Sequence, residues 1–276
     1  MPLRRVEVTR IDPASAEHPV TRDDELIVEE PLAIRVGGES LAVTMRTPGA
    51  DAELVMGFLW AEGVIRSRDD VSSITRCARP DDPTRDNTVE VTLAPGVRSP
   101  LDDVDAPLFA RRGTITSSAC GVCGRRSIDD LLTSFRPVAD GPGVARAVIS
   151  AAVRDLHERQ PMFARTGGCH AASLRTAAGE HVVTFEDVGR HNAVDKVVGA
   201  RLRAGALPLA GHLLVVSGRS SFEIVQKALA AGIPVVVSVS AASSLAVDLA
   251  RRGNLTLIGF ARGDAMTVYA GVERIV

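Results

Sequence analysis

The stretch Leu213-Leu214-Val215-Val216-Ser217-Gly218-Arg219-Ser220-Ser221 decides the fold class of this chain. Four consecutive apolar residues run into a loop of serine and glycine, which is the composition of a buried strand and the turn that leaves it. Helices and strands alternate in the sequence that follows. We predict a helix over 222–231, a strand over 235–239, a helix through 245–249 and a strand over 255–260. Strands that alternate with short helices indicate right-handed crossovers and a largely parallel sheet.

The segments before this stretch extend the organisation toward the N-terminus. A helix is predicted over 144–156 and a strand over 182–185. Apolar alternation on both sides of Gly37-Gly38 predicts a hairpin, and Asp51 is placed to cap a helix. A strand is predicted over 89–93. We therefore expect an α/β chain with four parts: an irregular segment over 1–28, a smaller α+β domain over 29–115, a CxxC loop and linker over 116–143, and an α/β domain over 144–276.

Three loops leave the carboxyl ends of the predicted strands, at Ser217–Ser221, Ser240–Ser244 and Ala261–Asp264. Ligands in open α/β sheets bind at that edge. Glycine allows close backbone approach, and serine hydroxyls and arginine guanidiniums suit phosphate oxygens. Serine and glycine are also ordinary turn residues. The pattern therefore favours a nucleotide-like ligand and plain loops about equally.

Composition narrows the classes of function. Among the 276 residues, aromatic side chains make up 3% and the formal net charge is -2. A protein that stacks bases on exposed rings, or that is drawn to nucleic acid by a global basic field, is not expected. No uninterrupted apolar run of the roughly 18 residues that a spanning helix needs is present. We expect a cytoplasmic protein without a signal peptide, a membrane anchor or a nucleic-acid partner.

The sharpest local signal is a pair of thiols among glycines, Cys120-Gly121-Val122-Cys123-Gly124. Ser127 with Asp130 has the spacing of a capping box, and Arg125-Arg126 stands beside the pair. A helix start and two cations both favour a thiolate. At a free pKa near 8.5 about 3% of a thiol is ionised at pH 7, and a drop of two units raises that to roughly three quarters.

Spacing alone leaves four uses for this pair. It favours half of a zinc site first, with Cys77, Cys169 and His170 as further ligands. A dithiol redox pair comes second and the carriage of sulfur third. Two buried structural thiols are the least favoured, because the flanks are rich in glycine. Cys169 and His170 are adjacent, so they do not form a catalytic dyad by themselves, and a core or ligand-contact role is equally open for His170.

Two more segments are rich in polar groups. The segment Glu186-Asp187-Val188-Gly189-Arg190-His191-Asn192-Ala193-Val194-Asp195-Lys196 follows a predicted strand, and its apolar spacing indicates partial burial. Buried charges need partners, so we favour a functional or subunit-interface role over a solvated helix start capped by Asp187 or Asn192. Arg46-Thr47-Pro48-Gly49 is interpreted as a turn.

Taken together, these motifs resemble the FdhD family of accessory sulfurtransferases for formate dehydrogenase. The resemblance runs in order over about 30–270. It rests on 45–49, 57–65, Cys120–Gly124, 166–172, 186–196, Ser217–Ser221 and 258–262.

The resemblance implies a homodimer with a smaller N-terminal α+β domain and a three-layer C-terminal domain of the cytidine-deaminase-like fold. It implies that sulfur comes from a cysteine desulfurase, travels as a persulfide on Cys120, and is passed to the metal of a bound substrate, the molybdenum cofactor in its bis-molybdopterin guanine dinucleotide form. No permanent metal is expected. The family's cofactor segment falls on Phe260, Ala261, Arg262, Gly263, Asp264 and Ala265.

A zinc deaminase is not expected, because that chemistry needs a His-x-Glu motif and a Pro-Cys-x-x-Cys motif, and both are missing. Our hypothesis makes Cys120 and Cys123 the catalytic pair, with Cys123 resolving the disulfide left behind. Two rivals stay open: a chaperone that binds the molybdenum cofactor without sulfur transfer, and a thiol-disulfide oxidoreductase.

Overall fold

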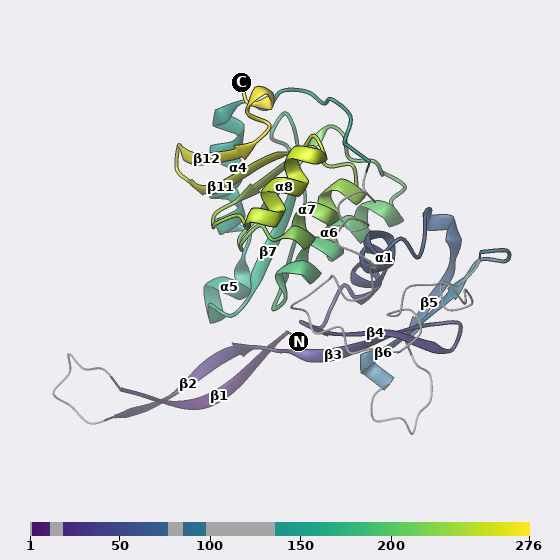
Figure 1. The fold of residues 1–276 in the computed structure, drawn as a ribbon. Helices are drawn as coiled ribbons and strands as arrows, with labels where there is room; N and C mark the ends of the chain where they lie inside the picture. The colour runs from purple at the N-terminus through teal and green to yellow at the C-terminus, as the bar shows by residue number, and fades with distance from the viewer. Residues whose placement is uncertain (1, 12–18, 77–84, 98–135) are drawn as a thin grey trace.

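The apolar stretches of the second half form the strands of one sheet. The computed structural model describes residues 2–11, 19–76, 85–97 and 136–276, which form two lobes and a projecting hairpin (Figure 1). In the C-terminal lobe six strands are ordered β12-β11-β10-β9-β7-β8. They are β7 (His170–Thr176), β8 (His181–Asp187), β9 (His212–Val216), β10 (Val235–Ser238), β11 (Thr256–Arg262) and β12 (Ala265–Ala270).

The sheet is mixed, and this corrects the expectation of a largely parallel one. β9, β10 and β11 are parallel, whereas β7, β8 and β12 run antiparallel to their neighbours. The reason lies in the connections. Helical crossovers join the three parallel strands, but short turns join β7 to β8 and β11 to β12, and a short turn can only make an antiparallel pair.

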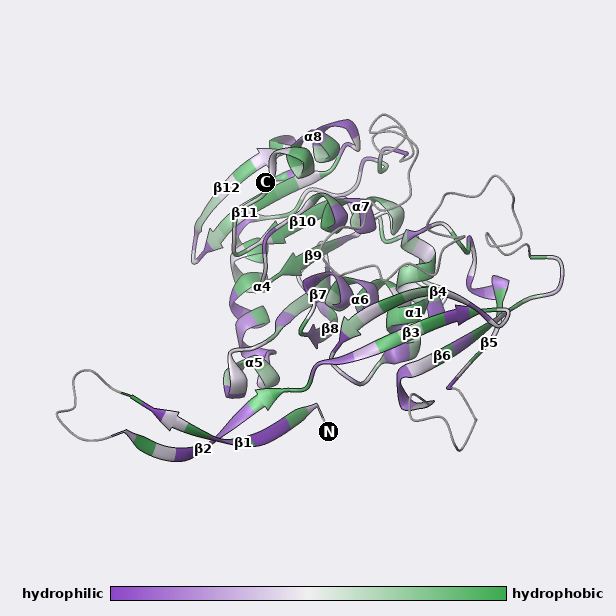
Figure 2. Ribbon diagram, turned by 60° about the horizontal axis from the view of Figure 1, so that its bottom comes forward, coloured by the Kyte–Doolittle hydropathy of each residue, from purple (hydrophilic) through white to green (hydrophobic). Residues whose placement is uncertain are grey.

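Helices cover both faces of this sheet, so the expected three-layer arrangement is confirmed. On one face α4 (Arg146–Glu158) packs Ile149, Ala152 and Leu156 against alternate residues of β9, β10 and β11. The other face carries α6 (Arg190–Arg203), α7 (Phe222–Ala230) and α8 (Ser244–Arg252). Figure 2 shows the central strands as a hydrophobic layer between these helices. Burial on both faces explains the continuous apolar runs in the sequence.

The N-terminal lobe is a four-stranded sheet with one helix. Its strands are ordered β4-β3-β6-β5: β3 (Glu30–Val36), β4 (Glu39–Arg46), β5 (Val71–Arg76) and β6 (Thr88–Leu93). The predicted hairpin is confirmed, with Gly37 and Gly38 at φ of 60° and 87° in its turn. The helix α1 (Asp51–Ala61) begins after Ala50, which is left-handed. Asp51 is therefore the first helical residue and not the cap that we expected.

The two lobes meet where α1 crosses α6, at a contact made by backbone. A Cβ on Gly57 would lie 2.0 Å from the carbonyl oxygen of Asp195, and a Cβ on Gly199 would lie 1.8 Å from that of Glu53. Atoms cannot approach so closely, so both positions require glycine. The interface also shares its apolar core, because Leu202 of α6 is buried among side chains of the N-terminal lobe.

The expectation of an irregular segment over 1–28 is wrong for the residues that are described. β1 (Leu3–Arg10) and β2 (Val20–Ile27) pair antiparallel and project from the body (Figure 1). The root of this hairpin contacts α5 (Pro161–Thr166), where Arg165 pairs with Glu25 at 2.6 Å. The dense charges of both strands hid the period of two in the sequence. Val138, which belongs to the predicted linker over 116–143, is buried in the core of the C-terminal lobe.

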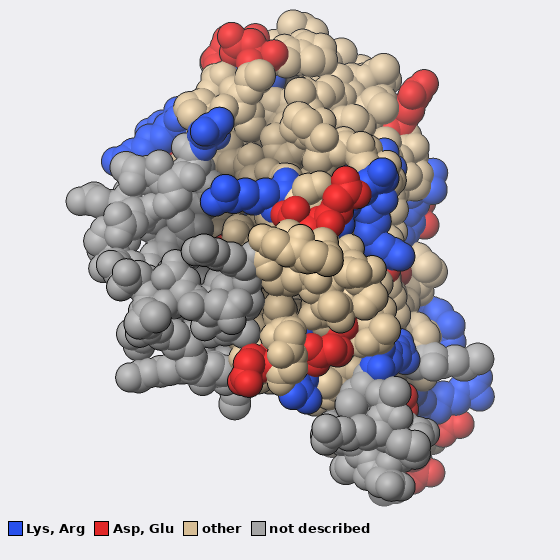
Figure 3. All heavy atoms as spheres, turned by 90° about the vertical axis from the view of Figure 1, so that its right-hand side faces the viewer, with Lys and Arg blue, Asp and Glu red and all other residues tan. Residues whose placement is uncertain are grey.

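Short 3₁₀ turns complete the described elements, at η1 (Arg68–Asp70), η2 (Arg85–Asn87) and η3 (Val272–Arg274). No helix within the described ranges is long and apolar enough to cross a membrane. On the face shown in Figure 3, acidic and basic side chains are interspersed among uncharged ones and do not form one large patch of a single charge.

We predict that Gly199→Ala destabilises the protein by about 1–3 kcal/mol or more, because the added methyl group must push the backbones of α1 and α6 apart. Urea denaturation followed by circular dichroism measures the effect. Gly211→Ala is the matched control, since a Cβ there meets nothing within 4 Å and the residue is not left-handed. Equal midpoints for the two variants would show that the helices have room to move.

Candidate functional site

A pocket of about 480 Å³ opens at the carboxyl edge of the parallel strands. It lies between this edge, the last turns of α4, and α5. Three residues of the predicted strand-end segments line it, Ser217 after β9 and Ala261 and Arg262 of β11. The remaining walls combine apolar side chains with a few polar ones: Val153, Leu156, His157, Gln160, Phe163, Gly167, Gly168, Cys169, His170 and Val239. An apolar pocket with a few polar groups is typical of a small-molecule site.

The predicted cofactor segment, Phe260 to Ala265, is a hairpin and not a loop. It comprises the end of β11, a tight turn and the first residue of β12. Phe260 has φ of 51°, and the strand pairing shifts register beside it. A bulky residue in this left-handed region is strained, and Phe260 is nevertheless 48% exposed. Strain of this kind clusters at functional sites, and the cofactor-binding role of this segment stays a prediction.

The loop Ser217–Ser221 makes hydrogen bonds within the protein that its sequence did not indicate. Ser217 Oγ accepts a hydrogen bond from Ala171 N at 2.9 Å, and Gly218 O accepts one from Ser238 Oγ at 2.6 Å. Ser220 is fully buried. The Ser217 hydroxyl thus binds the backbone, whereas Ser220 Oγ is buried without a hydrogen-bond partner among the described residues. Ser217 alone of this loop lines the pocket.

One histidine and two arginines gather at this loop in what we call the basic cluster, His170, Arg190 and Arg219. His170 begins β7 and Arg190 begins α6, and both side chains pack on Gly218, since a Cβ there would lie 3.2 Å from His170 Nδ1 and 3.5 Å from Arg190 Cδ. Burial and the charge of Arg190 lower the pKa of His170. Burial and then the charge of Arg219 lower the pKa of Arg190. Nε of Arg190 is buried and makes no hydrogen bond within the described residues.

A buried acid stands next to the basic cluster. His191 Nε2 lies 2.7 Å from Glu223 Oε2 and 3.0 Å from Ser221 Oγ. Both contacts use the same ring nitrogen, so these three residues do not have the arrangement of a hydrolytic triad, in which the acid holds Nδ1. Glu223 also attracts Arg190. An anion bound at the cluster therefore meets a site whose positive charge is partly balanced.

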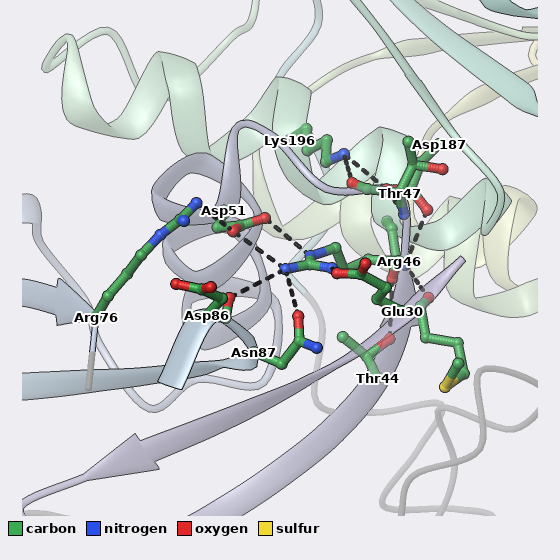
Figure 4. Close-up of polar contacts among 12 residues, drawn as sticks. Glu30, Thr44, Arg46, Thr47, Asp51, Arg76, Asp86, Asn87, Asp187 and Lys196 are labelled. Atoms are coloured by element: carbon green, nitrogen blue, oxygen red, sulfur yellow. Dashed lines mark hydrogen bonds and ion pairs between the residues drawn. The ribbon is translucent and has the colours of Figure 1, made fainter. Parts of the chain in front are cut away.

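Arg46 is the centre of a polar network in the N-terminal lobe, which corrects its interpretation as part of a simple turn. Its side chain is 1% exposed, and its guanidinium donates to Asp51 (3.0 and 3.4 Å), Glu30 (3.2 Å) and Asn87 (3.1 Å) (Figure 4). Arg76 donates to the same carboxylate of Asp51 at 3.0 Å. These contacts explain why Asp51 is not a helix cap.

The residue after Arg46 faces the other lobe. Asp187, at the end of β8, is 0% exposed, and its carboxylate accepts hydrogen bonds from Thr47 N (3.1 Å), Gly189 N (2.8 Å) and Asn192 Nδ2 (3.1 Å). Lys196 Nζ lies 2.6 Å from the same carboxylate (Figure 4). Neither Asp187 nor Asn192 caps α6, whose cap is Gly189 without a side-chain bond.

We call these contacts, together with those of their neighbours, the interlobe lock; its members are Thr44, Met45, Thr47, Asp187, Val188, Asn192 and Lys196. Asn192 Nδ2 donates to Met45 O at 2.7 Å, Val188 N donates to Thr47 Oγ1 at 3.0 Å, and Lys196 Nζ donates to Thr47 O at 3.0 Å. We expected partners for the charged residues of 186–196, but nothing in the sequence indicated that these partners lie at the end of β4 and in the turn after it.

Cys169 lines the pocket but is a poor nucleophile. Its Sγ lies 3.3 Å from Glu186 Oε1, and the residue is 4% exposed. Burial, followed by the hydrogen bond to Glu186 and its charge, raises the pKa of this thiol to about 12. The carboxylate of Glu186 also accepts from Met162 N and Phe163 N at the start of α5. Cys169 is thus a protonated donor in a structural contact.

The other cysteines, Cys77, Cys120 and Cys123, lie outside the described residues, as do Arg125, Arg126 and the predicted capping box of Ser127 and Asp130. Within the described ranges, no group of three or more His, Cys, Asp or Glu side chains could hold a metal ion. The zinc hypothesis for Cys77, Cys169 and His170 with the CxxC pair stays a prediction.

The fold and the site define an α/β protein with a pocket at the carboxyl edge of its sheet and the basic cluster beside it. The FdhD/NarQ family model matches residues 27–276. The chain is 54% identical over 273 residues to the sulfur carrier protein FdhD of Anaeromyxobacter dehalogenans (strain 2CP-C), which covers 95% of this chain and 94% of the relative. The FdhD protein of Streptomyces coelicolor is 50% identical over 262 residues, or 92% and 90% of the two chains.

A solved structure agrees with these relatives. The crystal structure of a candidate formate dehydrogenase accessory protein from Desulfotalea psychrophila matches with a TM-score of 0.76 and 25% identity, over 99% of each chain. The chain belongs to the FdhD/NarQ family.

We predict that native Cys169 resists alkylation. At pH 8 a thiol with a pKa of about 12 has a thiolate fraction on the order of 10³ lower than a thiol of pKa near 9, and burial restricts access further. Peptide mass spectrometry after a short exposure to iodoacetamide checks this, with the protein in 8 M urea as the matched control. Similar rates in the native and denatured protein would contradict the structural role of this thiol.

Proposed function

We propose that this chain is a sulfur carrier that serves formate dehydrogenase in the cytoplasm, as a homodimer. In this proposal it takes sulfur from a cysteine desulfurase as a persulfide on Cys120 and transfers it to the metal of bis-molybdopterin guanine dinucleotide. The observation that carries the proposal is the pocket at the carboxyl edge of the sheet, beside the basic cluster, in a chain of the FdhD/NarQ family. The names of the relatives support the sulfur-carrier role.

The pocket and the cluster suit a ligand that is part planar and part anionic. Apolar walls of α4 and α5 would receive a ring system. Arg190, Arg219 and Arg262 carry guanidiniums, which match phosphate oxygens with two donors each. Gly218 lets the backbone approach closely, since even a Cβ would crowd the neighbouring side chains. A guanine dinucleotide has both kinds of surface, which supports the pocket as the cofactor site.

The sulfur steps balance with the two thiols of the CxxC pair. The Cys120 thiolate attacks the outer sulfur of the desulfurase persulfide, the sulfur–sulfur bond breaks, and the desulfurase cysteine leaves as a thiolate. Cys123 then attacks the inner sulfur of the Cys120 persulfide and releases hydrosulfide for the metal. The Cys120–Cys123 disulfide that remains is reduced by a cellular dithiol. The high pKa of Cys169 supports the assignment of both steps to other cysteines.

We predict that incubation with a cysteine desulfurase and free cysteine adds the mass of one sulfur atom to the wild-type protein, about 32 Da, and that dithiothreitol removes it. Intact-protein mass spectrometry makes the measurement. Cys120→Ser loses the gain and Cys169→Ser keeps it, because the Cys169 thiol is buried and protonated. A gain that survives in Cys120→Ser sinks the persulfide scheme and leaves the cofactor chaperone or the oxidoreductase.

We predict that Arg190→Gln weakens the binding of guanosine 5′-diphosphate, used as a probe, by roughly 10- to 100-fold. The lost hydrogen bond is charge-assisted and contributes about 1.5–3 kcal/mol, and about 1.4 kcal/mol corresponds to tenfold. Isothermal titration calorimetry gives the dissociation constant. Arg252→Gln, an exposed arginine at the far end of α8, is the matched control. Equal losses in both variants would mean that the probe responds to overall charge, not to this site.

A further inference from the structure

The first turn of α6 is shared by two parts of the molecule. On one side Asn192 belongs to the interlobe lock, because Nδ2 donates to Met45 O at 2.7 Å and Oδ1 accepts from Thr44 Oγ1 at 3.2 Å. On the other side Arg190 packs on Gly218 within the basic cluster. These contacts stand two residues apart on one turn of helix, so a movement of one is transmitted to the other.

The approach to this turn is held by the N-terminal lobe as well. Val188, two residues before Arg190, donates its N–H to Thr47 Oγ1 at 3.0 Å. Gly189 donates to Asp187, whose other carboxylate oxygen accepts from Thr47 N. Thr47 is 1% exposed and so has little freedom to move. The backbone that leads into α6 therefore takes its position from a residue of the other lobe.

We propose that Thr47 is a positioning residue that holds Arg190 in place for the anionic part of the ligand. Its hydroxyl fixes Val188, Val188 fixes the start of α6, and the start of α6 fixes the Arg190 side chain. Misplacement of a binding group by about an ångström is enough to lose much of its contribution. The proposal rests on the proposed function, in which Arg190 contacts a phosphate.

The inference gives the N-terminal lobe a role in ligand binding without any contact to the ligand. Coupling of this kind is reciprocal, so the ligand should also strengthen the interlobe lock. Gly57 and Gly199 bring α1 and α6 into backbone contact and limit sliding between the lobes. The hydroxyl of Thr47 then decides the finer placement of the α6 start.

A double-mutant cycle on the full chain tests this, with guanosine 5′-diphosphate as the probe and calorimetry as the measurement. We expect Thr47→Val, which removes the hydroxyl and keeps the shape, to raise the dissociation constant roughly five- to twentyfold. Thr47→Ser, which keeps the hydroxyl, should restore wild-type binding. In the Arg190→Gln background, Thr47→Val should change the dissociation constant less than about twofold, because the group that it positions is already gone.

A purely structural role gives a different result: Thr47→Val then weakens binding equally in both backgrounds, and the inference is overturned. It is also overturned if Thr47→Val binds as well as the wild type. Where Thr47→Val does not fold, Thr47→Ala takes its place in the same cycle, since it removes the same hydroxyl from Val188 N. Should Arg190→Gln bind the probe normally, the anion site of the proposed function is wrong, and that failure is separate from the two above.

Discussion

The buried carboxylate of Asp187 is the contact on which the arrangement of the two lobes depends. An ionised carboxylate without water costs several kcal/mol unless hydrogen bonds and a cation replace the lost solvation. Here the donors come from both lobes, from Thr47 of the N-terminal lobe and from Gly189, Asn192 and Lys196 of the C-terminal lobe. A change of the angle between the lobes would leave some of these groups unpaired in a place that water does not reach. The polar contact therefore selects one arrangement, while the apolar surfaces around it are far less selective.

The crossing of α1 and α6 supplies the complementary constraint. With glycine at 57 and 199 the two backbones touch, and this brings the turn after β4 within reach of Asp187. Larger residues would separate the helices and open the polar contact. The close packing of the two glycines and the hydrogen bonds to the buried carboxylate of Asp187 therefore depend on each other. Arg46 continues it into the N-terminal lobe, because its own carboxylate partner, Asp51, is the first residue of α1.

The sequence predicts the elements of this fold better than it predicts how they are joined. Long apolar runs predicted β9, β10 and β11. The rule that ligands bind at the carboxyl ends of parallel strands predicted the edge at which the pocket lies. The mixed sheet was missed because strand direction depends on connections that composition does not encode. The β1–β2 hairpin was missed because charges interrupt its alternation. The Arg46 network and the partners of 186–196 were missed for a different reason: contacts such as that of Thr47 with Asp187 join residues 140 positions apart, and no local pattern reports them. Ser217 shows the opposite error, because a hydroxyl that suits a phosphate is equally suited to the backbone, and its Oγ accepts a hydrogen bond from Ala171 N.

A sulfur carrier of the kind proposed must combine two properties that conflict in one place. The thiol has to be accessible and ionised to accept sulfur, whereas a site that grips a large anionic cofactor has to be rigid and partly dry. Cys169 illustrates the conflict, because the same burial that makes it part of the pocket raises its pKa to about 12 and removes its reactivity. A persulfide carried within the pocket wall would be subject to the same penalty. The proposal avoids this penalty because it assigns the sulfur to Cys120 and not to Cys169, while α6 holds Arg190 and α4 and α5 supply the apolar walls of the pocket. In such a design the interlobe contact at Asp187 serves the chemistry indirectly, because it keeps the binding surface unchanged while sulfur is delivered to it.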